Sequence, residues 1–211
     1  MARRIILLAL WLGFIVYAFK FAPPDQPDTT QLIRHLATGQ WAGINPVVVA
    51  LFNLMGIWPM AYACLALIDG HGQRISAWPF VIGSFGLGAF LLLPYLILRY
   101  PHPIFEGSKS KVLALVDARW LGASLFIGAT VLMGYGAYAG DWSDFVRQWQ
   151  TSRFIHVMSL DFCLLWLLVP SLLGDDMARR GLKNSQLFTL FSVVPLLGLT
   201  AYLSLRPPLN N

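Results

Sequence analysis

The chain has 211 residues, of which 57% are hydrophobic and only 12% are charged, and its net charge is +5. A soluble domain normally carries about 25% charged residues, so this composition excludes an ordinary soluble fold and indicates an integral membrane protein. The 15 Lys and Arg residues are spread along the chain and form no basic block, which argues against a nucleic-acid partner and for contact with the lipid bilayer.

The first apolar run, residues 5–19, can be extended to Ala22 and is predicted to be a membrane anchor. Cleavage of a signal peptide after Ala22 would leave Pro23 at the new N-terminus, so we expect the anchor to be retained. A polar stretch follows, in which residues 31–37 are expected to form one or two turns at the interface. We therefore predict one membrane-embedded domain over residues 1–211, with an anchor and interfacial segment at 1–43 and a helical core at 44–211.

Asn45-Pro46 predicts the start of a second span that runs to about Ile68, because Asn is a good N-cap and Pro fits the first helical turn. The next four apolar helices are expected at residues 78–98, 112–139, 154–173 and 186–205. A short amphipathic helix at the interface is predicted from residues that share one helical face, Trp142, Phe145, Val146 and Trp149. The expected fold class is all-α, a helical bundle with about six transmembrane helices, or five if residues 5–22 do not cross.

The expected orientation follows from the positive charges in the loops. The third-to-fourth and fifth-to-sixth connections together hold seven Lys and Arg residues, against four in the connections on the other face. Positively charged loops are retained in the cytoplasm, so we expect these two connections to face it. Six spans would then place the N-terminus outside.

Small residues four positions apart in the predicted fourth helix indicate close helix packing. They form two pairs: Ser124 with Gly128, and Gly136 with Gly140.

Residues 154–170 read FIHVMSLDFCLLWLLVP and place one carboxylate, Asp161, inside an apolar run. A charged group in lipid costs a few kcal/mol, so it needs a partner or a role. Arg119 is the expected partner, because it enters the membrane from the opposite face at a similar depth, and Asn53 and Tyr135 are neutral alternatives. Two interpretations stay open: a clamp between helices, or a proton relay or substrate ligand.

His156 lies five residues before Asp161, about 140° round the helix, so the two side chains do not share a face. We expect His156 to form a hydrogen bond at the helix entrance. Ligation of haem would need a second histidine in the membrane, but the others, His35, His71 and His102, lie in predicted loops. No cofactor is predicted, and a single chlorophyll held by His156 is the alternative.

A second group of charges lies at the ends of predicted helices. The stretch GDDMARR sets Asp175 four residues before Arg179 and Asp176 four residues before Arg180, spacings that suit ion pairs on a helix. Asp69 opens a Gly-rich turn, DGHGQR. We expect all five residues in interfacial loops.

The sequence contains no P-loop, HExxH or GxSxG, and Cys64 and Cys163 lack the spacing of metal ligands or of a disulfide framework. Neither catalytic residues nor a metal site is therefore predicted.

Three stretches, NLMGIWPMAYACLALIDGHGQRISAWPFVIGSFGLGAFLLLPYLILR, FIHVMSLDFCLL and DDMARRG, carry a resemblance that covers residues 45–206. They resemble a functionally unassigned family of multi-pass membrane proteins from cyanobacteria and plant chloroplasts. The resemblance implies a photosynthetic membrane, and the absence of a Ser/Arg-rich transit peptide favours the thylakoid or plasma membrane of a cyanobacterium. The candidate functional residues within the matching stretches are Asp69, His156, Asp161, Asp176 and Arg179.

The expected function is that of a non-catalytic polytopic membrane protein, an assembly factor or accessory subunit that binds other subunits of a photosynthetic complex. The first alternative is a small proton-coupled transporter in which Asp161 titrates. The second is an enzyme that modifies a lipid, quinone or pigment, and the missing catalytic motifs argue against it. Asp161→Asn distinguishes the first two, because a structural clamp tolerates the change and a transporter does not.

Overall fold

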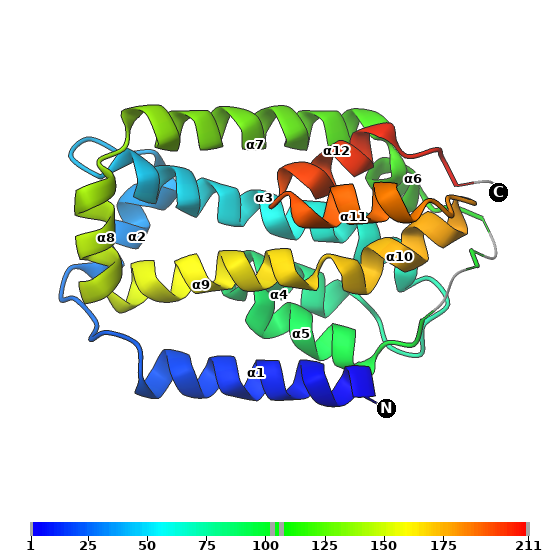
Figure 1. Ribbon diagram of the computed structural model, residues 1–211, viewed down its shortest axis with the longest axis horizontal. Coiled ribbons are helices and arrows are strands. Elements are labelled where there is room, and N and C mark those ends of the chain that lie inside the picture. The colour runs from blue at the N-terminus through cyan, green and yellow to red at the C-terminus, as the bar shows by residue number, and fades with distance from the viewer. Residues whose placement is uncertain (1, 102–103, 106–107, 210–211) are drawn as a thin grey trace.

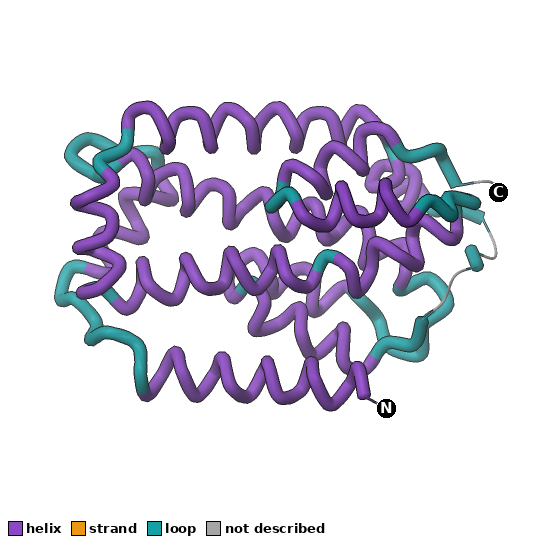
Figure 2. Tube along the Cα trace, in the orientation of Figure 1, coloured by secondary structure: helices purple, strands orange, loops and turns teal. Residues whose placement is uncertain are grey.

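The computed structural model describes residues 2–101, 104–105 and 108–209, and all regular structure within them is helical (Figures 1 and 2). Helices are required of a chain in lipid, where backbone N–H and C=O groups find no water. Four segments are long and apolar enough to span a membrane: α1 (Ala2–Lys20), α3 (Pro46–Asp69), α7 (Arg119–Ala139) and Arg153–Arg179, which comprises α9 (Arg153–Leu168) and α10 (Pro170–Arg179). The prediction of an all-α fold with helices able to span a membrane is confirmed.

The four segments run antiparallel along the long axis of the molecule (Figure 1). Both ends of the described chain lie at one end of this bundle, which we call the basic face. At the opposite face lie the two short polar helices, α2 (Thr29–Thr38) and α8 (Trp142–Thr151). The side chain of Asn45 caps α3, accepting a hydrogen bond from the Val47 N–H at 3.0 Å, and its amide donates to Asp144 at 2.9 Å. The predicted N-cap therefore also ties α3 to α8.

The expected third span does not cross the bundle. Residues 78–98 form two half-length helices, α4 (Trp78–Leu87) and α5 (Ala89–Leu98), which fold back on each other at Gly88 (Figure 1). The rings of Phe80 and Tyr95 lie 5.8 Å apart, so residues on either side of Gly88 are neighbours. Each ten-residue helix is about 15 Å long, half of a hydrocarbon core of about 30 Å. We call this segment hairpin 1.

The expected sixth span is a second hairpin. It comprises α11 (Ser185–Val193) and α12 (Leu197–Leu205), which turn at Pro195 and Leu196. The rings of Phe191 and Tyr202, on either side of the turn, lie 5.5 Å apart. Both hairpins enter the bundle from the basic face and return to it (Figure 1). Four spanning segments and two hairpins thus replace the six expected spans, and the N-terminus lies on the same face as the arginine-rich connections.

Two other helix boundaries differ from the prediction. The expected fourth helix breaks at Ala118, whose backbone is extended, into α6 (Lys111–Asp117) and α7. The expected fifth helix restarts at Pro170 and continues as α10 to Arg179, because proline fits the first turn of a helix. The charges of the stretch GDDMARR therefore lie on a helix end instead of in a loop.

The helix pattern repeats at an interval of 107 residues, the separation from Pro46 to Arg153 and from Trp78 to Ser185. The sequence repeats at the same interval: YLILR at 95–99 and YLSLR at 202–206 differ at one position. We call residues 45–101 and 152–208 the first and second halves. Each contains a long helix that ends at the basic face and a hairpin that dips back from it (Figure 1). Because both have the same orientation, an approximate two-fold axis along the bundle relates them.

The core is centred on α3, which is apolar on all sides and buries Trp58, Ala61 and Tyr62 completely. α7 packs closely against it, because a Cβ at Gly136 would meet Ala50 and a Cβ at Gly140 would overlap Val47. Gly128 faces Ile57 across the same contact, whereas Ser124 is exposed and donates a hydrogen bond to the Trp120 carbonyl of its own helix.

The basic face carries eleven of the 15 Lys and Arg residues. They are Arg3, Arg4, Arg74, Arg99, Lys109, Lys111, Arg119, Arg179, Arg180, Lys183 and Arg206. The opposite face carries Lys20, Arg34, Arg147 and Arg153. Because the hairpins do not cross, the positive charges concentrate on one face more strongly than six spans would allow.

Candidate functional site

The Asp161 carboxylate lies in the middle of α9 and is 5% exposed. Its Oδ1 accepts a hydrogen bond at 2.9 Å from the backbone N–H of Ala89, the first residue of α5. The first N–H groups of a helix have no partner within the helix and carry a partial positive charge. The turn of hairpin 1 therefore supplies the carboxylate with an N–H donor and a favourable dipole.

Gly88 allows this approach for two reasons. Its φ of +47° and ψ of −128° suit the first central position of a type II′ turn, where glycine is preferred. A Cβ at Gly88 would also overlap Oδ2 of Asp161. The backbone conformation and the neighbouring carboxylate thus both require glycine at this position.

The partner predicted for Asp161 was wrong. Arg119 follows the break at Ala118, so it lies at the basic face, where its Nε donates to the Arg206 carbonyl at 2.7 Å. The neutral alternatives do not reach Asp161 either. Asn53 donates to the Val49 carbonyl of its own helix at 2.8 Å, and Tyr135 is 40% exposed on α7.

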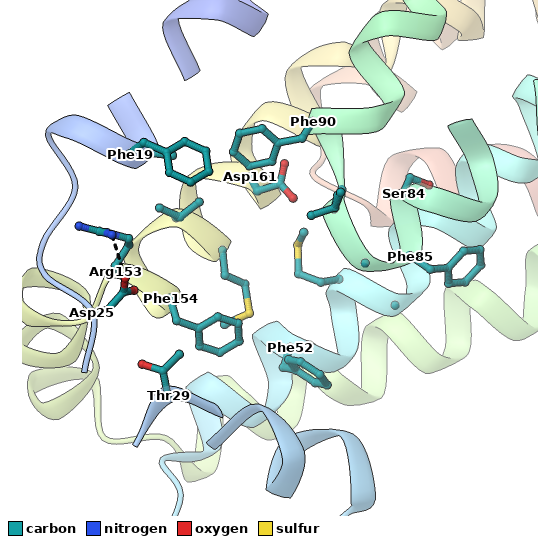
Figure 3. A pocket seen from close by; sticks show the side chains of 18 residues that line it. Phe19, Asp25, Thr29, Phe52, Ser84, Phe85, Phe90, Arg153, Phe154 and Asp161 are labelled. Atoms are coloured by element: carbon teal, nitrogen blue, oxygen red, sulfur yellow. Dashed lines mark hydrogen bonds and ion pairs between the residues drawn. The ribbon is translucent and has the colours of Figure 1, made fainter. Parts of the chain in front are cut away.

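A cavity of about 440 Å³ extends from Asp161 toward the opposite face (Figure 3). Its walls are mostly apolar and come from α1, α3, hairpin 1 and α9; the large side chains are Phe19, Phe52, Met55, Phe85, Phe90, Phe154 and Met158. At the far end, Arg153 forms an ion pair with Asp25 at 2.8 Å, drawn as a dashed line in Figure 3. The volume and the apolar walls suit a small-molecule ligand, and Asp161 is the polar group that would orient it.

The basic face contains two equivalent buried clusters, one in each half. In the first, the Asp69 carboxylate accepts hydrogen bonds from Tyr95 at 2.5 Å and from Arg99 Nε at 2.6 Å. In the second, Asp176 accepts from Tyr202 at 2.7 Å and from Arg206 at 3.1 Å. Each residue of the first cluster lies 107 positions before its counterpart. The two carboxylates are fully buried, and each is paired with cations as buried charges require.

Each cluster also binds the other half. Arg99 donates to the Ser171 carbonyl at 3.0 Å, and Arg206 donates to the Cys64 carbonyl at 3.2 Å; Cys64 and Ser171 are themselves 107 residues apart. Arg179 of the second half forms an ion pair with Asp69 of the first. We call these reciprocal contacts the basic-face latch. They join the two halves at the basic face, whereas the cavity extends from Asp161 toward the opposite face.

The two helical ion pairs expected in GDDMARR have different outcomes. Asp176 and Arg180 do pair, with Nε and Oδ2 2.9 Å apart. Asp175 pairs with Arg99 of the first half, and Arg179 with Asp69. Because α10 extends to Arg179, these side chains face the ends of α3 and α5 and pair across the halves.

Asp117 belongs to the same face and lies outside the spanning helices. Arg180 approaches its carboxylate at 2.7 Å and Lys109 Nζ at 3.0 Å. Burial alone would raise the pKa of the Asp117 carboxyl, but the attraction of Arg180 and the hydrogen bond from Lys109 outweigh it and hold the pKa below its ordinary value.

His156 is engaged at both ring nitrogens. Nε2 lies 2.8 Å from the Tyr17 hydroxyl and Nδ1 lies 2.9 Å from the Trp149 carbonyl, and the imidazole stacks on the Trp149 ring at 4.3 Å. In this arrangement neither nitrogen points at an open ligand site. His102 lies outside the described residues, and among those described no three His, Cys, Asp or Glu side chains group as metal ligands.

Several site residues were not identified from the sequence, namely Gly88, Ala89, Tyr95, Arg99, Tyr202 and Arg206. Two signals for them are present. The Gly-rich run GSFGLG, at 83–88, interrupts an apolar segment, and the repeated YLxLR marks equivalent positions in the two halves.

The chain matches no protein-family model, and comparison with curated proteins and with solved structures gave no significant match. The geometry of the site therefore carries the functional argument.

Proposed function

We propose that this protein is a proton-coupled membrane carrier in which a substrate and a proton share Asp161. The observation that carries the proposal is the position of this carboxylate, about 12 Å from the start of the spanning segment Arg153–Arg179 and at the inner end of a cavity. Within the described part of the chain, no Lys, Arg or His side chain forms a hydrogen bond or an ion pair with it. An ionisable group at this depth without a cationic partner is a functional residue by default.

The architecture supports a carrier. Transporters commonly bind substrate near the bilayer midplane at interrupted helices, whose half-helix N-termini face charged groups. Hairpin 1 provides such an interruption, and α5 begins with its N-terminus at Asp161. Two halves in the same orientation are also a recurrent design of carriers, because one half can move against the other around a central site.

The cavity and the latch define the state of the carrier. The cavity extends toward the opposite face, and the latch closes the basic face. The excess of Lys and Arg supports an orientation in which the basic face lies in the cytoplasm or its equivalent compartment. The structure then corresponds to an outward-open state, and inward opening requires the reciprocal contacts between the halves to separate.

A charge-displacement measurement tests this function. Purified protein in liposomes on a solid support is exposed to a sudden change of pH, and the transient current is recorded. We expect a current from the wild type and none from Asp161→Asn. Asp144→Asn is the matched control, because it removes a carboxylate of α8 outside the cavity and should leave the current unchanged. A normal current from correctly folded Asp161→Asn would rule the proposal out.

A second proposal is an accessory or assembly role in a photosynthetic membrane, supported by the resemblance described above. The outer side of α7 offers a contact surface, because Trp120, Ile127, Val131 and Tyr138 are all exposed. An apolar face of this kind adjoins either lipid or a neighbouring subunit. Elution from native membranes in mild detergent together with pigment-bearing subunits would support this role, whereas a colourless protein that elutes alone would contradict it.

A further inference from the structure

We infer that the substrate is a monovalent organic cation with an apolar, ring-bearing body, which binds Asp161 in exchange for one proton. The inference rests on the proposed carrier function and names its substrate class.

The charge of the site selects a cation. Carboxylates within a membrane pair with positive groups, and the described residues around Asp161 supply a backbone N–H to Oδ1 but no cationic side chain. No hydrogen bond to a protein donor is present at Oδ2 among these residues, and Asp161 lines the cavity. The positive group that completes the pair must therefore arrive with the ligand.

The walls select an apolar body. Five phenylalanine side chains line the cavity: Phe19, Phe52, Phe85, Phe90 and Phe154. The faces of aromatic rings attract organic cations and also bury apolar substituents. An anion of the same shape would meet the same apolar surface, but it would be repelled by Asp161 at the inner end.

The mouth of the cavity does not provide a site for anions. Arg153 is already bound to Asp25 and also donates to the Pro23 carbonyl at 3.0 Å. Other ionisable groups near Asp161 are engaged elsewhere: Tyr62 donates to the Leu165 carbonyl at 2.5 Å, and His156 is held by Tyr17 and Trp149. Asp161 is thus the acid of this cavity that remains available to a proton or a cation.

Exchange at one carboxylate fixes the stoichiometry. A protonated Asp161 is neutral and attracts no cation, so a cation binds only as the proton leaves. One monovalent cation moves in one direction for one proton in the other, so the complete cycle transfers no net charge. The transient current after a pH jump then reports the proton that enters or leaves Asp161 through the cavity, and not turnover.

Equilibrium binding with two probes of the same shape and opposite charge tests this inference. Tetraphenylphosphonium and tetraphenylborate each present four phenyl rings, and they are titrated into the full chain in detergent. At a pH below the titration range of Asp161, we expect the phosphonium to bind and to release one proton per ion, and the borate not to bind. Below the titration range of Asp161, the apparent Kd for the phosphonium should rise about tenfold for each unit of pH decrease.

Three variants separate the carboxylate from the apolar walls. Asp161→Asn should abolish phosphonium binding, Asp161→Glu should retain it with an altered pH dependence, and Asp144→Asn should bind as the wild type does. Thermal unfolding in detergent confirms that each variant is folded. If Asp161→Asn fails to fold, the proton release by the wild type and the Asp161→Glu profile still decide the question.

Three results would overturn the inference: equal binding of the two probes, phosphonium binding without proton release at a pH below the titration range of Asp161, or binding of neutral triphenylphosphine oxide but not of the phosphonium. The current after a pH jump distinguishes this failure from failure of the carrier proposal. If that current depends on Asp161 while the phosphonium does not bind, the protein remains a carrier and its substrate is not an organic cation. If both signals are missing, both proposals fail.

Discussion

In the middle of α9, the carboxylate of Asp161 meets the first backbone N–H of α5 instead of a positively charged side chain. This contact depends on Gly88, because only a residue without a side chain leaves room for Oδ2 and adopts the turn conformation without strain. Gly88, the N-terminus of α5 that follows it, and the Asp161 carboxylate that faces both thus form one structural unit.

Gly88→Ala tests this unit. The new methyl group would overlap the carboxylate, and alanine would occupy a positive φ, so we expect the free energy of unfolding to fall by about 1–3 kcal/mol. The current that depends on Asp161 should also be lost. Gly86→Ala is the matched control, because no atom lies within 4 Å of a Cβ at this helical glycine, and alanine is preferred to glycine in a helix. Equal thermal unfolding of the two variants would contradict the role of Gly88.

At the scale of elements, the sequence predicts the apolar segments but not that two of them fold into hairpins. The apolar segments, the N-cap at Asn45 and the short helix at 142–151 were all predicted from local patterns. Hydropathy does not distinguish a helix that crosses from two half-helices that return, because both bury the same apolar residues. The difference at 78–98 depends on one glycine and on packing against α1, where Trp11 donates to the Phe90 carbonyl at 2.8 Å.

The candidate site was predicted only in part for the same reason. Asp161, Asp69 and Asp176 are conspicuous as acids in or beside apolar runs, and the sequence identifies them. Their partners lie on segments up to 110 residues away, so only the folded hairpins reveal them. The repeated YLxLR is present in the sequence and would have identified Tyr95 and Arg99 together with their counterparts.

Chemical labelling tests whether hairpin 1 returns to its starting face. In a chain with Cys64→Ala and Cys163→Ala, cysteine is introduced at Ser76 or at Ser108, two exposed positions on either side of the hairpin. Both cysteines should react with a membrane-impermeant maleimide from the face that also labels the N-terminus. A straight third span predicts labelling from opposite faces, and that result would refute the hairpin.

For the molecule as a whole, the approximate two-fold relation makes the two halves partners at the basic face. Each half contributes an Asp, a Tyr and an Arg to its own cluster and donates an Arg hydrogen bond to the other half. The halves differ at the midplane, because Leu54 occupies the position equivalent to Asp161, 107 residues earlier. The molecule therefore has a symmetric closure at one face and a single acidic site in its centre.

The symmetry predicts similar effects of Arg99→Met and Arg206→Met. Each change leaves a buried carboxylate short of one cation, which should lower the free energy of unfolding by about 3–5 kcal/mol. Arg74→Met removes an exposed arginine from the same face and should change it by less than about 0.5 kcal/mol. The free energy of unfolding of all three variants is measured in detergent. A large loss for one latch variant alone would show that the two clusters are not equivalent.

The reciprocal latch also bears on how the protein is made. When the first half leaves the ribosome, Asp69 has Arg99 and Tyr95 beside it, but Arg179 is still to be synthesised. Arg99 likewise awaits Asp175 and the Ser171 carbonyl. The first half consequently enters the membrane with incomplete charge pairing, and about eighty further residues must follow before its buried arginine is satisfied. During insertion of this chain, the second half therefore supplies the ion pairs and the hydrogen bond that the first half lacks.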